Sequence, residues 1–299
     1  MKNVFINLAI LYAFLFVGWL LGKLKKDKAT NADVLSILIV NVFLPCKVFN
    51  TFANNVSVPF IKERWYLLLA SITLLIILCI VAKFTAKLFT KNEYEQKVYT
   101  YSVPITNYAY LGYALIDSVF GELFLSQFMF FALPFVFYTY TFGYTLLTGG
   151  KNVAKRLLNP ITVAIVLGLI FGLTGLNIPS VIAKITSIGA NCVGPLSMLL
   201  TGITLSLFTI KELSTNVTAY IFAFIRLVAI PGIAYLICLI TKLNTILPMV
   251  LIITCMPCGL NPIVFPKLVG EDCKPGARLA LITHIFSLIT LPLWLSLII

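Results

Sequence analysis

Two stretches of the sequence interrupt long apolar runs with proline: residues 102–108 read SVPITNY, and residues 256–262 read MPCGLNP. Proline lacks an amide hydrogen and clashes with the preceding helical turn, so Pro104 and Pro257 should break any helix that passes through them. If these runs cross a bilayer, a break is tolerated only inside the protein or beside a water-filled cavity. Each proline is followed within four residues by an asparagine, whose amide can both donate and accept hydrogen bonds. The pattern favours a functional site over the alternative of two proline kinks whose unpaired backbone groups are hydrogen-bonded by neighbouring helices.

The composition around these stretches is that of a membrane protein. Of the 299 residues, 60% are hydrophobic and 11% are charged, and the mean hydropathy is +1.03. A water-soluble chain of this length needs many more polar residues to cover its surface. The net charge of +12 comes from basic residues in short loops, and no basic stripe with interleaved aromatics indicates a nucleic-acid partner.

Ten apolar runs are long enough to cross the hydrocarbon layer, which takes about 20 helical residues. They lie near residues 3–22, 32–52, 65–89, 98–118, 123–147, 159–176, 181–208, 216–240, 245–268 and 277–298. We expect the first of them to be a retained span rather than a cleaved signal, because no Ala-x-Ala site follows it.

The distribution of basic residues predicts the orientation. With the N-terminus outside, fifteen lysines and arginines fall on the cytoplasmic side and five on the opposite side. The fifteen are Lys23, Lys25, Lys26, Lys28, Lys83, Lys87, Lys91, Lys97, Lys151, Lys155, Arg156, Lys211, Lys267, Lys274 and Arg278. The positive-inside rule therefore predicts a multi-pass protein of the plasma membrane with both termini on the extracytoplasmic side.

Features of the first half of the chain recur in the second half at shifts of 149 to 153 residues. The pairs are Gly18/Gly168, Gly22/Gly172, Asn41/Asn191, Pro45/Pro195, Pro104/Pro257 and Gly121/Gly270. Each half holds five predicted spans, and an odd number inverts the second copy. The sequence therefore predicts an all-α membrane protein with ten transmembrane helices in two inverted five-helix repeats, residues 1–150 and 151–299.

Several short motifs carry a resemblance to a known family. They are MP at 256–257, Asn261, GED at 270–272, TH at 283–284, TLPLW at 290–294, RL at 226–227 before Pro231, and GP at 194–195 before Gly202. On these residues the chain resembles the auxin efflux carrier family, and within it the bacterial-type permeases. The family includes plant auxin exporters and bacterial permeases proposed for malate, malonate and related acids.

The resemblance implies that broken helices 4 and 9 cross at their prolines near the midplane of the membrane. It also implies an elevator, in which a transport unit of spans 3–5 and 8–10 slides against a scaffold of spans 1, 2, 6 and 7, and a homodimer of two scaffolds. The plant carriers read Asn-Pro-Asn-Thr-Tyr at the first crossing, whereas residues 103–108 here read VPITNY, so auxin itself is not carried over.

The residues at the two breaks and the polar residues inside the spans are the candidate substrate-binding residues. They are Pro104, Thr106, Asn107, Tyr108, Pro257, Asn261, Pro262, Asn41, Asn191, Lys47 and Arg226. Asp117 and His284 are the candidate coupling residues. We expect Asn107→Ala and Asn261→Ala to reduce uptake at near-normal thermal stability.

Each charged or titratable candidate also has a structural interpretation. Arg226 lies near mid-depth of its span, where an unpaired arginine costs about 2.5 kcal/mol or more, so it meets either protein groups or an anionic substrate. Lys47 either snorkels to the surface or attracts an anion. Asp117 can be an interfacial carboxylate, and His284 a packing residue rather than a proton relay.

The function that these features favour is secondary transport or facilitated passage of a small organic anion, with proton or sodium as candidate coupling ions. Direct ATP coupling is disfavoured because no phosphate-binding loop motif occurs. The alternatives are a sodium-coupled organic-anion symporter or sodium–proton exchanger with the same crossed helices, and a transporter-like membrane sensor. Neither HExxH nor GxSxG occurs, and the lone histidine cannot form a metal cluster, so we expect no enzyme, no cofactor and no metal.

Overall fold

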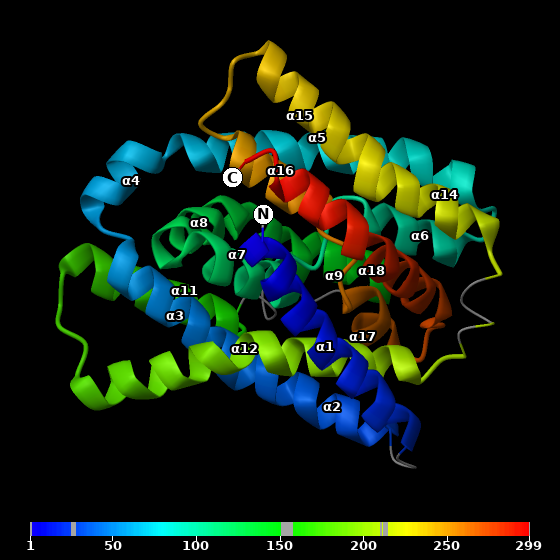
Figure 1. The fold of residues 1–299 in the computed structure, drawn as a ribbon, viewed down its shortest axis with the longest axis horizontal. Coiled ribbons are helices and arrows are strands. Elements are labelled where there is room, and N and C mark those ends of the chain that lie inside the picture. The colour runs from blue at the N-terminus through cyan, green and yellow to red at the C-terminus, as the bar shows by residue number, and fades with distance from the viewer. Residues whose placement is uncertain (1, 25–27, 151–157, 210, 212–214, 299) are drawn as a thin grey trace.

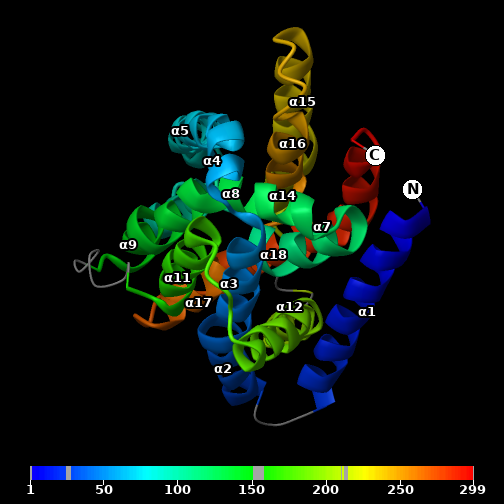
Figure 2. The ribbon, with the colours of Figure 1, turned by 90° about the vertical axis from the view of Figure 1, so that its left-hand side faces the viewer.

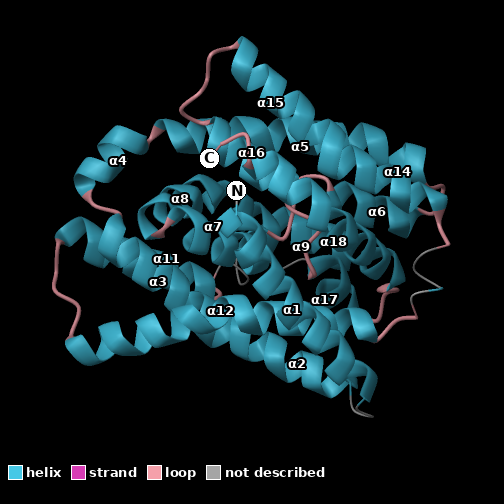
Figure 3. Cartoon of the chain, in the orientation of Figure 1, coloured by secondary structure: helices cyan, strands magenta, loops and turns pink. Residues whose placement is uncertain are grey.

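The structure is a computed structural model of the chain that describes residues 2–24, 28–150, 158–209, 211 and 215–298. Figure 3 shows helices joined by loops, with no strand in this described part. Five of the basic residues assigned above to cytoplasmic loops lie outside the described residues, namely Lys25, Lys26, Lys151, Lys155 and Arg156.

Within the described residues, seven helical stretches are long and apolar enough to cross a membrane, which makes this a multi-pass membrane protein. They are Val4–Leu24, Ala32–Asn55, Tyr66–Phe89, Glu122–Thr148, Ser180–Ser206, Val217–Ile240 and Lys274–Leu295. The shorter apolar helix α11 (Pro160–Thr174) corresponds to the run predicted at 159–176. Large apolar side chains such as Phe84 and Ile240 are more than two-thirds exposed, as expected of a surface that faces lipid.

One set of helices, which we call the α12 group, packs around α12 (Ser180–Ser206). Its other members are α1 (Lys2–Leu24), α2 (Lys28–Leu38), α3 (Leu44–Asn55) and α11. Between α2 and α3 the helix continues through a π-helical turn at Ile39–Phe43. Figures 1 and 2 both show α2, α3 and α12 together in the lower half of the molecule.

Glycines allow the helices of the α12 group to approach closely. At the contact between α1 and α12, a Cβ at Gly18 would lie 2.2 Å from the Leu199 carbonyl oxygen. A Cβ at Gly202 would lie 2.0 Å from the Leu15 carbonyl oxygen. On α11, a Cβ at Gly172 would lie 2.4 Å from the carbonyl oxygen of Val56, at the end of α3. The spaced glycines therefore serve close helix packing, as their spacing predicts.

The remaining helices form a second set, which we call the crossing group. Its first part comprises α5 (Tyr66–Phe89), α6 (Glu93–Ser102), α7 (Tyr113–Phe120), α8 (Glu122–Tyr138) and α9 (Tyr144–Thr148). Its second part comprises α14 (Val217–Phe224), α15 (Ile230–Ile240), α16 (Leu247–Cys255), α17 (Asn261–Lys267) and α18 (Lys274–Leu295). The short helix α4 (Val58–Arg64) leads from α3 into α5.

Three further π-helical turns join helices of the crossing group: Tyr108–Gly112 before α7, Thr139–Gly143 between α8 and α9, and Ile225–Ala229 between α14 and α15. Helix starts follow ordinary capping chemistry. The side chains of Asn92 and Asn159 each accept two amide hydrogens from the first turns of α6 and α11.

The runs predicted at 98–118 and 245–268 are both interrupted, as their prolines predict. The first is divided between α6 and the helical segment Tyr108–Phe120, and the second between α16 and α17. Residues 103–107 and 256–260 are the two non-helical connections. Their contacts place the candidate site.

Candidate functional site

The two interruptions meet through main-chain atoms. Thr106 and Cys258 form an isolated antiparallel β-bridge, and the backbone N–H of Asn107 donates to the Pro257 carbonyl at 2.8 Å. Gly259 lies at the same contact, because a Cβ there would be 3.3 Å from the Thr106 carbonyl oxygen. We call this meeting point the crossing.

Side chains form hydrogen bonds with the backbone groups that the second break leaves without partners in the helix. The carbonyl of Ile253 would bond to the amide of residue 257 in a continuous helix, but Pro257 has none. It accepts instead from Thr106 Oγ1 at 3.2 Å and from Arg226 Nη2 at 3.4 Å. Arg226 Nη1 donates to the carbonyl of Thr254, the next residue.

A side chain also accepts the hydrogen of the first backbone amide after Pro257, that of Cys258. The Cys258 N–H, which would donate to Thr254 in an unbroken helix, donates to Thr283 Oγ1 of α18 at 3.0 Å. Arg226 is fully buried, so its guanidinium neutralises the negative C-terminal end of α16 where water does not reach. The structure thus places Arg226 directly behind the crossing, on main-chain carbonyls.

Asn107 and His284 are brought together at the crossing. The Ala280 carbonyl can only accept, so His284 Nδ1, at 2.7 Å from it, carries a hydrogen. In the neutral ring Nε2 then accepts from Asn107 Nδ2 at 3.1 Å. The Asn107 side-chain oxygen accepts from the Leu111 amide at 3.4 Å and so caps the helical segment that begins at Tyr108.

Asn261 lies on the other broken helix, and its Nδ2 donates to the Tyr101 hydroxyl at 2.8 Å. Pro262 is buried against the first turn of α18, where a Cβ at Gly276 would lie 2.2 Å from the Pro262 carbonyl oxygen. Both residues therefore belong to the packed wall of the crossing.

A cavity of about 40 Å³ opens at the crossing. It is lined by Leu44, Thr106, Asn107, Tyr108, Ala109, Tyr110, Thr139, Tyr140, Gly259, Leu260 and Asn261. This volume holds no more than a few water molecules, so the structure shows the crossing in a closed arrangement. None of the lining residues is charged.

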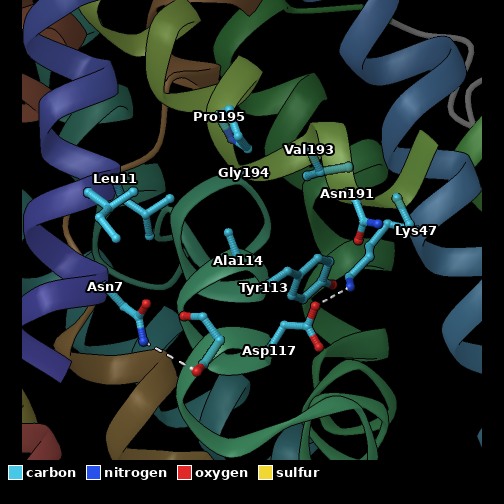
Figure 4. Close-up of a pocket in the computed structure, with 13 residues that line it drawn as sticks. Asn7, Leu11, Lys47, Tyr113, Ala114, Asp117, Asn191, Val193, Gly194 and Pro195 are labelled. Atoms are coloured by element: carbon cyan, nitrogen blue, oxygen red, sulfur yellow. Dashed lines mark hydrogen bonds and ion pairs between the residues drawn. The ribbon is translucent and has the colours of Figure 1, made fainter. Parts of the chain in front are cut away.

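Three other candidates meet in a separate pocket of about 170 Å³ between α1, α3, α7 and α12. Lys47 Nζ lies 2.6 Å from Asp117 Oδ2, with 7% of the lysine side chain exposed and 33% of the aspartate side chain. Figure 4 shows Asn191 beside Lys47, and Asn7 on the opposite wall. We call this space the Lys47 pocket.

A smaller cavity of about 30 Å³ lies next to both sites. Its lining shares Tyr113 with the Lys47 pocket, and Tyr108, Ala109 and Tyr140 with the crossing cavity. The Lys47 pocket and the crossing cavity are therefore neighbours along the helical segment Tyr108–Phe120.

Asn41 belongs to neither group. It is exposed within the π-helical turn of α2–α3, and its Nδ2 donates to the Ile37 carbonyl of its own helix at 2.8 Å. Asn41 lies six residues before Lys47, which is about 240° around a helix, so the two side chains point to different faces.

The sequence did not single out Asn7, Tyr113, Tyr110, Thr139 or Tyr140, which line the two sites. Asn7 has a visible signal, since it is a lone amide within an apolar run. The tyrosines and Thr139 have none, because hydropathy does not distinguish a cavity-lining tyrosine from one that packs against lipid headgroups. Clusters of three or more His, Cys, Asp or Glu side chains that could hold a metal ion do not occur among the described residues.

Comparison with known proteins identifies the family. A family model described as membrane transport protein matches residues 3–153 and 144–295. The chain belongs to this auxin efflux carrier family. The membrane transport assignment implies a small-molecule substrate and a bilayer setting, and it favours a transporter over an enzyme.

Two proteins that resemble this chain are both described as uncharacterized transporters. One, from Methanocaldococcus jannaschii, is 27% identical over 303 residues, which cover 95% of this chain and 96% of the relative. The other, from Saccharomyces cerevisiae, is 33% identical over 75 residues, which cover 25% of this chain and 13% of the relative. The resemblance stated from the sequence motifs is thereby confirmed.

Proposed function

We propose that this protein is a secondary transporter that carries a small organic anion, and that the solute binds at the crossing. The observation that supports this most directly is the backbone contact of the two interrupted helices, Asn107 to Pro257, beside a polar cavity. Broken helices that meet inside a membrane protein are a recurrent design for solute sites in secondary transporters.

The chemistry of the crossing cavity suits an anion. Tyr108, Ala109 and Tyr110 form the first turn of the helical segment that runs to Phe120, and all three line the cavity. First-turn amides have no intrahelical acceptor, and the helix dipole adds partial positive charge there. Since no carboxylate lines the cavity, a bound anion meets no negatively charged side chain there.

We infer that the chain consists of two inverted five-helix repeats, residues 1–150 and 151–299, with ten transmembrane segments. The two broken segments, 93–120 and 247–267, would be spans 4 and 9. Matching glycine contacts support the repeat, because Gly18 and Gly22 of α1 pack on α12 as Gly168 and Gly172 of α11 pack on α3. Both termini would then face the outside of the plasma membrane.

The proposed motion is an elevator movement of the crossing group against the α12 group. The α12 group would be the scaffold, and its exposed apolar faces would form the interface of a homodimer. The contacts of Gly18, Gly22, Gly168, Gly172 and Gly202 lie within the scaffold. Polar contacts such as Lys47–Asp117 and Lys267–Asp33 join it to the crossing group. Polar contacts of this kind can exchange with water as one body slides along the other.

The test is uptake by proteoliposomes of radiolabelled L-lactate, malonate, malate and indole-3-acetate, with and without sodium. We expect saturable uptake of at least one acid, reduced roughly tenfold by Asn261→Ala, because the variant lacks one polar group at the cavity. Asn54→Ala is the matched control, since Asn54 is an exposed asparagine of α3 whose Nδ2 binds only Asn50 of its own helix. Binding of these acids without flux would support a sensor. If neither binding nor flux is observed for any of these acids, the proposal is overturned.

A further inference from the structure

The Lys47 pocket has features that a purely structural ion pair does not need. Lys47 comes from α3 and Asp117 from α7, so the pair joins the α12 group to the crossing group. Lys47 is more than nine-tenths buried and its ammonium borders a cavity of about 170 Å³. The ammonium has three hydrogens, and Asp117 is the side-chain acceptor for one of them.

The lining of the pocket matches a small amphipathic ligand. Asn191 adds an amide beside Lys47, and Ser118 and Asn7 add polar atoms on the far wall, where Asn7 Nδ2 donates to the Ser118 carbonyl at 3.3 Å. Leu11 and Val193 supply apolar surface. Since an apolar cavity of about 150 Å³ holds a benzene molecule, this one has room for roughly six non-hydrogen atoms.

Charge balance restricts which ligand enters. The pocket is neutral as it stands, with one ammonium and one carboxylate, and a bare anion would leave an uncompensated negative charge inside the membrane. A carboxylate ligand can enter without net charge if one proton enters with it. The ligand then takes the place of Asp117 on Lys47, and the proton binds Asp117 Oδ2.

We propose that the Lys47 pocket is a binding station for a short-chain monocarboxylate that is taken up together with one proton. This rests on the proposed function, because it places the station beside the crossing, with the small cavity that shares Tyr113 with the pocket and Tyr108 with the crossing cavity lying next to both. The proton comes from the solution from which the ligand enters. Binding would also part the Lys47–Asp117 contact between the two groups of helices, which frees the crossing group to move.

Few other titratable groups face this pair. Among the described lining residues, α7 contributes the Tyr113 phenol, while α1 and α12 contribute the amides Asn7 and Asn191 and no charge. Glu122, at the start of α8, accepts from Asn50 Nδ2 at 3.3 Å and does not line the pocket. The proton that accompanies the ligand is therefore assigned to Asp117.

The experiment measures L-lactate binding to the full chain in nanodiscs by calorimetry, in buffers of different ionisation enthalpy and at several pH values. We expect one proton taken up per lactate, and an apparent affinity that falls about tenfold per pH unit above neutrality. Lactamide, which lacks the charge, should not bind. If alanine binds independently of pH, the pocket is a zwitterion site and the proposal is overturned.

The two members of the pair should respond in opposite directions. Asp117→Asn should bind lactate independently of pH and without proton uptake, because Lys47 no longer has a competing carboxylate. Lys47→Gln should lose lactate binding at every pH. The double variant carries no uncompensated charge and should fold normally but bind no lactate, which separates lost binding from lost folding.

Asp33→Asn and Lys267→Gln are the matched controls. They remove an ion pair of 2.6 Å that also joins the two groups of helices, but both of its side chains are exposed and line none of the pockets described. If Lys47 and Asp117 variants only lower thermal stability and leave lactate binding unchanged, the station does not exist. If an acid is transported without proton uptake, the proposed function stands and this inference fails; absence of any transport overturns the proposed function instead.

Discussion

At the residue scale, Arg226 and Asn107 are buried polar side chains at the crossing, and both bind main-chain groups there. Arg226 and Asn107 were selected from the sequence because a charge and an amide inside apolar runs require partners. The sequence could not show whether those partners are protein groups or a solute. In the structure Arg226 binds two carbonyls of α16, and Asn107 binds His284 and the Leu111 amide.

Replacement of Arg226 by methionine should destabilise the fold. The carbonyls of Ile253 and Thr254 would lose charged donors inside the membrane, at a cost of roughly 2–4 kcal/mol. A clear drop in the midpoint of thermal unfolding in detergent should report it, with Arg226→Lys intermediate because lysine lacks the planar fork. Lys184→Met, at an exposed position of α12, should leave the midpoint unchanged. If Arg226→Met retains the midpoint but loses anion binding, the guanidinium serves the solute directly.

Asn107→Ala should lower both uptake and stability, which differs from the expectation drawn from sequence alone. The variant leaves His284 Nε2 without its partner, a loss that costs about 1–3 kcal/mol when the group is buried. It also removes the side-chain acceptor of the Leu111 amide, which keeps its main-chain bond to the Asn107 carbonyl at 3.2 Å. Asn261→Ala removes one hydrogen bond, to Tyr101, and should destabilise less. Comparison of the two unfolding midpoints checks this order; equal midpoints would contradict it.

At the scale of the elements, the apolar runs predict most helix ends within a few residues, since hydropathy and length are strong signals in membranes. The runs at 65–89, 123–147 and 181–208, for example, correspond to helices Tyr66–Phe89, Glu122–Thr148 and Ser180–Ser206. The π-helical turns were not predicted, because one extra residue in a turn changes neither hydropathy nor charge.

Glycine contacts between elements can be tested directly. Gly18→Leu should prevent α1 from packing on α12, because even a Cβ would lie 2.2 Å from the Leu199 carbonyl oxygen. We expect loss of folded protein, measured by size-exclusion recovery and thermal unfolding. Gly232→Ala is the control, since its Cβ would make an ordinary contact of 3.5 Å with Trp294. Normal recovery of Gly18→Leu would show that the two helices can separate.

At the scale of the whole molecule, the family resemblance implies that the two breaks meet, but not that the candidates divide between two sites. The residues alone predict only that each break is buried in protein or beside water, because unpaired backbone groups are costly in lipid. The Lys47 pocket depends on the rotation of α3 against α7 and on the position of α12. Such relative placement is set by side-chain packing over the whole interface, which short motifs do not encode.

Cross-linking tests whether the two groups of helices move against each other. Asn50 of α3 and Glu122 of α8 lie 3.3 Å apart at their side-chain tips. With Asn50→Cys and Glu122→Cys joined by a short thiol cross-linker, in a background without Cys46, Cys79, Cys192 and Cys273, uptake should stop and recover on reduction.

The control cross-link joins two helices of the α12 group. Phe49→Cys and Phe171→Cys connect α3 to α11, whose rings lie 5.7 Å apart in the native chain. This link should leave uptake intact, since neither helix changes its neighbour in the proposed motion. If both cross-links abolish uptake, or if neither cross-link does, a sliding movement between these groups is ruled out.

Main-chain atoms form the contact between the two interrupted helices, from Asn107 to Pro257 and from Thr106 to Cys258. This contact uses no side-chain atom of Tyr110, Thr139 or Tyr140, and the side chains that support the backbone beside it are those of Thr106, Arg226 and Thr283. Cavity-lining positions such as Tyr110, Thr139 and Tyr140 can therefore vary during evolution while the contact persists. Relatives that share this fold are then free to diverge in the solutes they accept, and solute preference has to be established for each member separately.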